Sequence, residues 1–360
     1  MKEMIIQVSQ EKYPIVIGSN IYDQLPNYLT KVGITEKSKI LIITDNNVAD
    51  FHLHKIMNIL DEYDTYSYIV PAGEYSKSMK QVEKIIEYAL LKGLDRFSTI
   101  IALGGGVVGD LAGFIAAIYM RGISFIQCPT TILAHDSSVG GKVGINHPLG
   151  KNLIGAFYQP KLVFYDTSFL HTLPRRQVLS GFAEVIKHGL IANAEFTNWL
   201  GTNVNSLLAL EHDYVIEALY KGIGVKAAIV RKDEKELGVR AFLNYGHTLA
   251  HAIETISDYQ YLHGEAVAIG MVFASKLAYE IGIASNEVVK LTENLIHSFS
   301  LPIRVKEKYD PNRLVEIMMR DKKFKNNQIR MILPTAIGNV VIKENIDRRQ
   351  IVDLLQEFIK

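Results

Sequence analysis

The sequence predicts an α/β domain followed by a mainly α-helical domain. Up to about Asp166, short β-branched and aliphatic runs alternate with helical stretches, a pattern typical of a largely parallel sheet with helices on its faces. Beyond Leu173 and Pro174, almost every segment has helical periodicity. A chain of 360 residues is also too long for one ordinary hydrophobic core. We therefore expect an α/β domain at residues 1–173 and an α-helical domain at 174–360.

The elements of the first domain follow one another at short intervals. We expect strands at residues 39–45, 66–70 and 98–103, and helices at 48–60 and 79–92. The N-terminal residues alternate in polarity like a strand, and another apolar strand is expected at 123–129.

Composition excludes several classes of protein. Lys and Arg total 39 against 38 Asp and Glu, so a net charge of +1 provides no field that would attract nucleic acid or an anionic membrane. No apolar run is long enough to span a bilayer, and the N-terminus lacks the apolar core of a signal peptide, so we expect a cytoplasmic protein. The single cysteine, Cys128, excludes an internal disulfide, and its apolar surroundings indicate a buried structural thiol.

A glycine-rich turn follows the strand at 98–103. Gly104, Gly106 and Gly109 fit the pattern G-x-G-x-x-G ahead of an apolar helical run at 111–120. Such glycines let backbone amides approach a pyrophosphate, which the helix N-terminus also attracts. On this interpretation the domain is Rossmann-like, and Asp45, at the tip of an earlier strand, could hold a ribose hydroxyl. The alternative is a turn packed against a neighbouring helix, because the motif lies outside the first βα turn.

The most polar and glycine-dense stretch occupies residues 130–157. We expect a long loop there, and such loops inside compact domains are usually functional. Lysines among glycine amides suit a phosphate or carboxylate ligand, and an ordinary solvated loop is the alternative. The loop contains five polar candidates for binding: Asp136, Lys142, Asn146, Lys151 and Asn152.

Three histidines between residues 244 and 265 indicate a transition-metal site. His247 and His251 are four apart in a helical segment, so their rings leave the same face. His263 follows a turn that would let the chain fold back toward that face. Such ligands suit Zn²⁺, although a catalytic site usually adds a carboxylate and keeps positions open. Alternatively, His251 lies in the core and His263 on the surface.

Glu184 is a candidate for the missing carboxylate. With Lys187 and His188 it lies on one side of an otherwise apolar helix, where a carboxylate needs a partner. An ordinary ion pair is the alternative. Further charges precede the histidine segment at residues 226–240, and we expect most of them to form a solvated face. A basic loop and a strand-like run at 329–333 follow late in the chain.

Nine short motifs, in order and spread over almost the whole chain, closely resemble 3-dehydroquinate synthases. They are GExxK (73–77), GGGVVGD (104–110), PTT (129–131), DSSVGGK (136–142), NHPLGKN (146–152), GFAEVIKHG (181–189), LNYGHTLAHAIE (243–254), LHGEAV (262–267) and DKK (321–323). The resemblance implies a cytoplasmic, homodimeric enzyme of the shikimate pathway and aromatic amino-acid biosynthesis, with NAD and Zn²⁺ or Co²⁺. Such an enzyme converts 3-deoxy-D-arabino-heptulosonate 7-phosphate into 3-dehydroquinate and phosphate. In agreement with the net charge, we expect no nucleic-acid or membrane partner.

The same resemblance implies roles for individual residues. Glu184, His247 and His263 match metal ligands, and His251 and Glu236 match residues that transfer protons. Substrate contacts are implied for Asp136, Lys142, Lys151, Asn152, Lys187, Lys226, Arg240, Asn244, Lys322 (with Lys323 as its alternative) and Arg121 of the partner subunit. NAD contacts are implied for Asp45, Asn47, Glu74, Lys77, Gly105, Gly106, Val107, Asp110, Thr130, Thr131, Lys142, Lys151 and the segment from Phe169 to Thr172.

The implied reaction uses NAD without consuming it. The substrate is transiently oxidised, loses phosphate by β-elimination, is reduced again, and closes by an intramolecular aldol step after ring opening. Three alternatives remain: a cyclase acting on another sugar phosphate, a metal-dependent polyol dehydrogenase that releases NADH, and a catalytically silent binding protein. The basic residues argue against the dehydrogenase, and the intact metal-ligand set argues against the silent protein.

Overall fold

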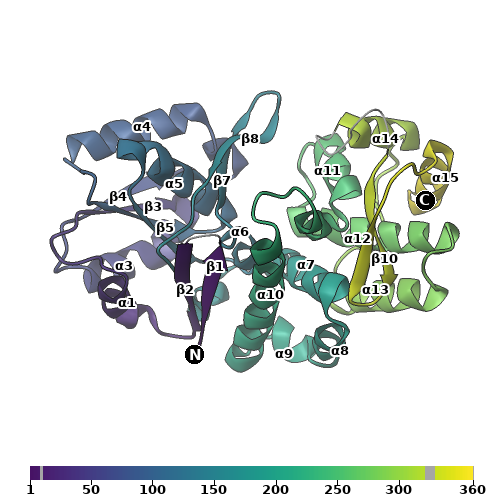
Figure 1. Cartoon of the computed structure of the whole chain (residues 1–360), viewed down its shortest axis with the longest axis horizontal. Coiled ribbons are helices and arrows are strands. Elements are labelled where there is room, and N and C mark those ends of the chain that lie inside the picture. Colours follow the sequence, from purple (N-terminus) through teal and green to yellow (C-terminus); the bar gives the residue numbers. More distant parts are fainter. Residues whose placement is uncertain (9–10, 321–328, 360) are drawn as a thin grey trace. The chain divides into compact units, whose positions relative to one another are not determined.

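The structure is a computed structural model that describes residues 1–8, 11–320 and 329–359 (Figure 1). The chain divides into two compact units, Met1–Leu173 with His212–Ile223, and Pro174–Glu211 with Gly224–Lys360. The first unit is an α/β structure and the second is mainly helical, so the predicted fold class is confirmed. Within the described residues, no helix combines the length and apolar character that crossing a membrane requires.

A seven-stranded sheet forms the centre of the first unit, in the order β1-β2-β9-β6-β5-β3-β4. The antiparallel pair β1 and β2 lies at one edge, and the remaining neighbours are parallel. The strands are β1 (Lys2–Val8), β2 (Glu11–Gly18), β3 (Ile40–Asp45), β4 (Thr65–Val70), β5 (Thr99–Gly104), β6 (Ser124–Pro129) and β9 (Leu162–Asp166). The strands expected at 39–45, 66–70, 98–103 and 123–129 are confirmed as β3, β4, β5 and β6.

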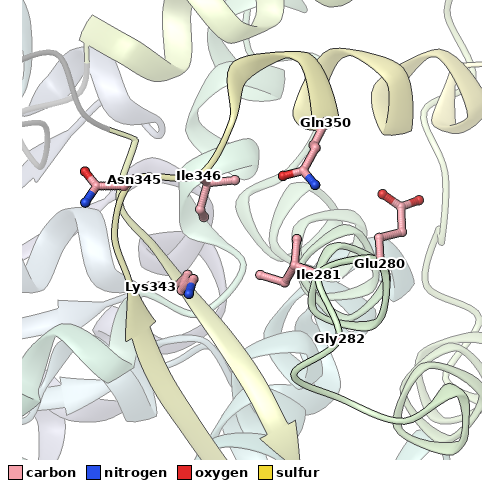
Figure 2. Close-up of a pocket in the computed structure, with 7 residues that line it drawn as sticks. All are labelled: Glu280, Ile281, Gly282, Lys343, Asn345, Ile346 and Gln350. Atoms are coloured by element: carbon pink, nitrogen blue, oxygen red, sulfur yellow. The ribbon is translucent and has the colours of Figure 1, made fainter.

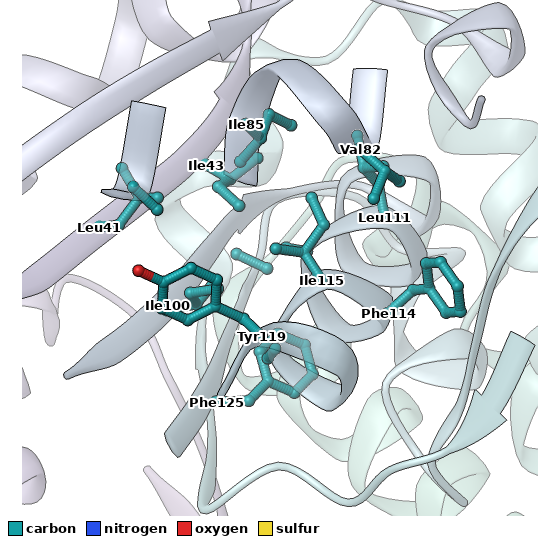
Figure 3. Packing of buried hydrophobic residues seen from close by; sticks show 14 of the residues in the cluster. Leu41, Ile43, Val82, Ile85, Ile100, Leu111, Phe114, Ile115, Tyr119 and Phe125 are labelled. Carbon is teal, nitrogen blue, oxygen red and sulfur yellow. The ribbon is translucent and has the colours of Figure 1, made fainter. Parts of the chain in front are cut away.

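Helices cover both faces of this sheet because successive strand residues point to opposite sides. Leu41 and Ile43 pack on one face with α4 (Met79–Leu91) and α5 (Gly106–Ile118), as Figure 3 shows. The residues between them, such as Ile42, pack on the other face with α1 and α3. The remaining helices of this region are α1 (Leu25–Lys31), α2 (Asn46–Val48), α3 (His54–Ile59), α6 (Ala134–Ser137) and the short turns η1 (Tyr22–Gln24), η2 (Ala49–Leu53), η3 (Glu74–Ser76), η4 (Tyr119–Arg121) and η5 (Thr167–Thr172).

Two expectations for this unit need correction. Helix α5 begins at Gly106, inside the glycine-rich turn and five residues before the expected start at residue 111. The loop expected at 130–157 is wrong over most of its length, since it contains α6 and the hairpin of β7 (Lys142–His147) and β8 (Gly150–Phe157).

The hairpin forms because its glycines allow close pairing. Gly144 and Gly155 lie opposite each other, and a Cβ atom on either would lie 2.6 or 2.4 Å from a carbonyl oxygen of the facing strand. Val143 and Ile145 alternate with Lys142, Gly144 and Asn146 and are buried in the same cluster as α5. This alternation is a strand pattern, which the density of glycine and polar residues obscured in the sequence.

The second unit is a helical assembly with one small antiparallel pair of strands. Helix α12 packs against α7, α11 and α13, and it is buried along most of its length. The strand-like run expected at 329–333 overlaps β10 (Met331–Ala336), which starts two residues later. It pairs with β11, a strand that the sequence did not predict. The elements are α7 (Arg175–Ala192), α8 (Ala194–Thr202), α9 (Val204–Leu208), η6 (Val239–Asn244), α11 (His247–Ile256), α12 (His263–Glu280), α13 (Asn286–Ser298), α14 (Pro311–Arg320), β10 (Met331–Ala336), β11 (Asn339–Lys343), α15 (Arg348–Phe358) and α10 (His212–Lys232), which contributes residues to both units.

Candidate functional site

Three helices of the second unit bring a carboxylate and two imidazoles together. Glu184 lies in the middle of α7, His247 is the first residue of α11, and His263 is the first residue of α12. One ligand atom from each of the three residues lies within 4.8 Å of the others. The predicted fold-back of the chain after α11 therefore occurs, and it adds His263 to this group.

The spacing of these atoms fits a tetrahedral metal ion. Glu184 Oε1 lies 3.5 Å from His247 Nε2 and 3.3 Å from His263 Nε2. Two ligands about 2.1 Å from one ion at the tetrahedral angle are about 3.4 Å apart. One carboxylate and two imidazoles are also a set that zinc enzymes use, with the remaining position open to substrate. The residues thus fit a divalent transition metal.

Both histidines direct Nε2 toward Glu184 because Nδ1 has another neighbour. His247 Nδ1 lies 3.1 Å from the carbonyl oxygen of Tyr245, and His263 Nδ1 lies 3.5 Å from Glu254 Oε1. Burial lowers the pKa of His247 well below its usual value, although Glu184 opposes this effect, so the ring stays neutral as a ligand must. Burial also acts to lower the pKa of His263, but Glu184 and Glu254 outweigh it and raise that pKa to about 10. A divalent cation would replace the proton that these carboxylates favour.

Two glycines of α12 allow the three helices to approach so closely. A Cβ atom on Gly264 would lie 1.8 Å from the carbonyl oxygen of Ser180, one turn of α7 before Glu184. The Gly264 amide also donates to Ser180 Oγ, at 3.0 Å. Further along α12, a Cβ on Gly270 would lie 1.9 Å from the carbonyl oxygen of Gly246, immediately before the ligand at the start of α11. Glycine at these positions therefore sets the spacing of the ligands.

The start of α12 is held by a separate ion pair. Glu265 Oε2 accepts a hydrogen bond from the backbone N–H of Leu262, at 2.9 Å. Arg176 of α7 binds both oxygens of Glu265, each at 2.7 Å, and also donates to the carbonyl of Gln260. Such a bidentate pair constrains geometry more than a single contact does. It fixes the turn that delivers His263.

Several predicted substrate and proton-transfer residues lie in the same unit. Lys187 pairs with Glu184 Oε2, which leaves Oε1 directed toward the histidines. The ring of His251 lies 5.6 Å from that of His247 and 6.5 Å from that of His263, between ring centres. Asn244 Nδ2 donates to Glu236 Oε1, at 3.0 Å. Glu236 has a φ of +59°, a conformation that is uncommon for residues other than glycine and is found often at functional sites.

The expectation of a solvated face at residues 226–240 is wrong for two cations. The exposed fractions of Lys226 and Arg240 are only 6% and 1%. The carboxylate of Asp233 accepts backbone hydrogen bonds from Leu237, Gly238 and Arg240, so the segment folds back over the end of α10. Arg240 then points inward and donates to the carbonyl oxygen of Glu234. This closure depends on the folded chain, so the local pattern did not predict it.

In the first unit, the predicted NAD residues follow the carboxyl ends of the parallel strands. Asp45 and Asn47 follow β3, Glu74 and Lys77 follow β4, and Gly105 to Asp110 follow β5. Thr130 and Thr131 follow β6, and the segment from Phe169 to Thr172 follows β9. Ligands of doubly wound α/β folds bind at this edge, where the strand order reverses. The reversal lies between β3 and β5, because β4 adds on one side of β3 and β5 on the other.

The glycine-rich turn lies at that reversal point. Gly105 precedes α5, whose first residues are Gly106 and Val107, so their amides lie at a helix N-terminus, which favours an anion. Added Cβ atoms on Gly105 and Gly106 would lie 3.0 Å from Thr131 Cγ2 and 3.1 Å from Ser137 Oγ. Among the described residues, the buried hydroxyls of Thr130 and Ser137 have no hydrogen-bond partner. Glycine amides beside these two hydroxyls fit a phosphate group. The turn lies at the reversal of the strand order, although it is not the first βα turn of the chain.

A hydrogen-bond network joins the other NAD candidates. Lys77, which is 3% exposed, donates to Asp110 Oδ2 at 2.7 Å and to Asn152 Oδ1 at 2.5 Å. Asn146 accepts from the Asn152 amide at 3.0 Å and donates to Glu74 Oε2 at 2.8 Å. The network ties the β7–β8 hairpin to the segments after β4 and β5.

A buried histidine of η2, His52, supports the segment after β9. The ring of His52 lies 4.3 Å from the ring of Phe169, and its Nε2 lies 2.9 Å from Thr172 Oγ1. Thr172 in turn donates to the carbonyl oxygen of Phe169, at 2.8 Å. Burial lowers the pKa of His52 to about 4, so the ring remains neutral.

The remaining predicted residues of the first unit lie on α6, on the β7–β8 hairpin, at the end of β3 and in the turn after α5. Asp136 lies on α6, Lys142 opens β7, and Lys151 lies on β8. Arg121 is exposed in the turn after α5, with a φ of +67°. Asp45 accepts from the Val48 amide at 3.0 Å, and burial raises the pKa of its carboxyl group despite such bonds. Lys322 and Lys323 lie outside the described residues.

A surface hollow elsewhere in the second unit contains none of the predicted residues. It has a volume of about 460 Å³ and is lined by the end of α12, β11 and the segment leading into α15 (Figure 2). Glu280, Lys343 and Gln350 are among its lining residues. The metal-binding chemistry of this unit therefore lies away from this hollow.

Several contributors to the candidate site had no specific role in the sequence prediction. Asn146 was one of the polar binding candidates in the expected loop, and the structure shows that it connects Glu74 to Asn152. Glu254 and the glycines at 264 and 270 lie within the recognised motifs or beside them, but without an assigned role. An acid on the same helical face as the two histidines was the available signal for Glu254.

Models of one enzyme family match most of the chain. The model described as 3-dehydroquinate synthase N-terminal matches residues 67–180, and the model described as 3-dehydroquinate synthase C-terminal matches residues 181–324. The two ranges adjoin within α7, so the match is continuous.

Individual relatives extend the similarity to the whole chain. A 3-dehydroquinate synthase of Geobacillus thermodenitrificans (strain NG80-2) is 48% identical over 366 residues, and one of Geobacillus kaustophilus (strain HTA426) is 46% identical over 366 residues. Each alignment covers 100% of this chain and 99% of the relative. A solved structure of 2-deoxy-scyllo-inosose synthase with carbaglucose-6-phosphate, NAD⁺ and Co²⁺ has a TM-score of 0.91 at 26% identity, covering 99% of this chain and 100% of that chain. The chain therefore belongs to the 3-dehydroquinate synthase family.

Proposed function

We propose that this protein is a 3-dehydroquinate synthase, which converts 3-deoxy-D-arabino-heptulosonate 7-phosphate into 3-dehydroquinate and phosphate. The observation that carries this proposal is the group of Glu184, His247 and His263, whose spacing fits one divalent ion. The relatives named 3-dehydroquinate synthase, which align over the whole chain, supply the reaction. The shikimate pathway is the metabolic setting that follows from it.

The two sites divide the chemistry between them. When bound, NAD would supply reversible hydride transfer, and a divalent ion, Zn²⁺ or Co²⁺, would supply Lewis-acid polarisation of substrate hydroxyls. Glu184, His247 and His263 hold the ion. The amides of Gly105, Gly106 and Val107 bind the cofactor phosphates, with Thr130 and Thr131 beside them.

The other NAD residues hold the cofactor at the strand ends. Asp45 and Asn47 bind a ribose, and the segment from Phe169 to Thr172 contacts the cofactor after β9. Glu74, Lys77 and Asp110 keep their positions through the hydrogen-bond network that includes Asn146. Lys142 and Lys151, on the hairpin, contact both cofactor and substrate.

Basic residues bind the phosphate and carboxylate of the substrate. Lys187, Lys226 and Arg240 are almost fully buried, with exposed fractions of 1%, 6% and 1%. Cationic donors held in place by burial suit the phosphate and carboxylate groups of the substrate. These residues would fix the conformer from which phosphate leaves. Asp136, Asn152, Asn244 and Lys322 complete the proposed substrate contacts.

His251 and Glu236 are the proposed proton-transfer groups. The ring of His251 lies beside the rings of His247 and His263. His251 also lies on the same face of α11 as His247. Glu236 accepts from Asn244, which holds its carboxylate in place. His251 can therefore exchange a proton with a substrate bound near the metal ligands, and Glu236 is proposed for the same role from its match to the family.

The assembly and location are also part of the proposal. We propose a cytoplasmic homodimer in which residues 1–173 form the NAD-binding domain and 174–360 the metal and substrate domain. Arg121 would act on the substrate of the partner subunit. Its exposure, and the positive φ values of both Met120 and Arg121, support a functional role for this turn.

The test measures phosphate release from the heptulosonate phosphate, with NAD⁺ at a concentration far below that of the substrate. We expect many phosphates per NAD, loss of release after chelation, and recovery on adding Zn²⁺ or Co²⁺. The absence of phosphate release, or accumulation of NADH in step with substrate loss, would reject the proposal in favour of another substrate or a polyol dehydrogenase.

A second candidate substrate class follows from the similarity to 2-deoxy-scyllo-inosose synthase. Its structure has a TM-score of 0.91 to this chain, so a cyclase of this fold could accept a hexose phosphate. Assaying glucose 6-phosphate and a heptulose 7-phosphate lacking the carboxylate beside the heptulosonate phosphate separates the two. Faster turnover of either sugar phosphate without a carboxylate than of the heptulosonate phosphate would favour the second candidate.

A further inference from the structure

The acid Glu254 lies where it can control a metal ligand. It follows His247 by seven residues on α11, so both side chains leave the same face of the helix. Its carboxylate lies 3.5 Å from His263 Nδ1, while His263 Nε2 lies 3.3 Å from Glu184 Oε1. The imidazole of His263 therefore bridges two acids, one on each side of the ring.

The burial of Glu254 sets it apart from an ordinary surface acid. It is 6% exposed, and a carboxylate in such a position requires compensating contacts. His263 is the more exposed of the two ligand histidines, with 31% of its side chain accessible against 12% for His247. The better buried His247 is oriented by a backbone carbonyl. His263 has a carboxylate in the corresponding place.

We propose that Glu254 is a positioning residue for the metal, holding His263 with its proton on Nδ1 and its Nε2 free to bind the ion. The inference rests on the metal site of the proposed function. A carboxylate behind a ligand imidazole fixes the ring orientation and increases its basicity, and loss of such a partner typically costs 10-fold to 100-fold in metal affinity. Glu254 makes no direct contact with the reacting atoms in this account.

The test compares metal binding by the wild-type protein, Glu254→Ala and Glu254→Gln after removal of metal by chelation. Co²⁺ affinity is measured by competition with a chromophoric chelator, and the visible absorption of bound Co²⁺ reports the ligand geometry. Glu287→Gln, at an exposed acid in the first turn of α13, is the matched control.

We expect Glu254→Ala to raise the Co²⁺ dissociation constant by about 10-fold to 100-fold and to alter the absorption spectrum. Glu254→Gln should lose less Co²⁺ affinity, because the amide oxygen of glutamine can still accept a hydrogen bond from His263 Nδ1. A role confined to folding would lower the melting temperature without changing the Co²⁺ spectrum or affinity. If Glu254→Ala does not fold, the Co²⁺ affinity and absorption spectrum of the near-isosteric Glu254→Gln variant provide the test.

An affinity and a spectrum indistinguishable from those of the wild type and of Glu287→Gln, in a folded variant, would overturn the inference. Phosphate release by the wild-type protein is measured in parallel. Tight Co²⁺ binding without phosphate release would reject the proposed reaction, whereas normal release with unchanged Co²⁺ binding in both variants would reject only the role of Glu254.

Discussion

The candidate nucleotide site and the candidate metal site are built in different ways. The first consists mainly of backbone and short side chains at the ends of parallel strands, and each part follows its strand within a few residues. The second consists of side chains from three helices that are distant in the sequence, joined by glycine contacts between α12 and its neighbours. A strand-end site can be found from local patterns, whereas a helix-face site requires tertiary packing. The two should therefore respond differently to substitution.

The largest expected effect is that of Glu184→Gln. The amide keeps the size of the side chain but removes the anionic ligand, so we expect loss of tight metal binding and of phosphate release. NAD affinity should remain at the wild-type value because the candidate nucleotide site lies in the other unit. Metal content by mass spectrometry and NAD binding by fluorescence check both parts. A variant that keeps a full equivalent of tightly bound metal would contradict the ligand assignment.

The second largest effect is expected for the substitution Gly264→Ala. The added methyl group would lie 1.8 Å from a backbone oxygen of α7, so α12 must shift. Overpacking of this kind typically costs about 1–3 kcal/mol of unfolding free energy, and the displaced His263 should weaken metal binding as well. Denaturant unfolding and Co²⁺ titration provide the two measurements.

Gly201→Ala in α8 is the matched control for that substitution. The atom nearest to a Cβ added at Gly201 would be Leu295 Cδ1 at 3.7 Å, which is an ordinary van der Waals contact. Alanine in this helix should leave metal binding unchanged and raise stability by about 0.5–1 kcal/mol. Equal losses of Co²⁺ affinity in the two variants would show that the close contact at Ser180 does not set the ligand spacing.

Asn146→Ala should produce a smaller effect, confined to the nucleotide site. It removes the hydrogen bonds to Glu74 and to the Asn152 amide, each worth about 1 kcal/mol, so we expect NAD to bind up to about 30-fold more weakly. Co²⁺ affinity should not change. Isothermal titration with NAD⁺ is the measurement, and Asn58→Ala, at an exposed position of α3, is the control. Unchanged NAD affinity would remove Asn146 from the account.

The smallest effect should be seen at Cys128. Burial raises the pKa of its thiol to about 12, so almost no thiolate forms at pH 8. The native protein should resist iodoacetamide at that pH and react only after unfolding. Fast native alkylation accompanied by loss of NAD binding would contradict a purely structural role for this residue on β6.

Candidates could be selected from the sequence where the pattern was local. Glu184 was selected because an acid on an apolar helical face needs a partner, and the structure brings it to His247 and His263. The glycine turn was selected because it separates a strand from a helix. Burial of Lys226 and Arg240 was missed since it depends on loop closure by Asp233. The β7–β8 hairpin was taken for a loop because its pairing relies on glycines in opposite strands. Glu254 had no assigned role because its contact with His263 forms only when α12 folds back on α11.

The most direct test of the two-site account is a crystal structure of the Co²⁺-loaded protein with NAD⁺, recorded at the cobalt absorption edge. The account predicts an anomalous peak bound by Glu184, His247 and His263, and the NAD pyrophosphate at the turn of Gly105 and Gly106. Cobalt held by other residues, or NAD bound away from the ends of β3 and β5, would contradict it.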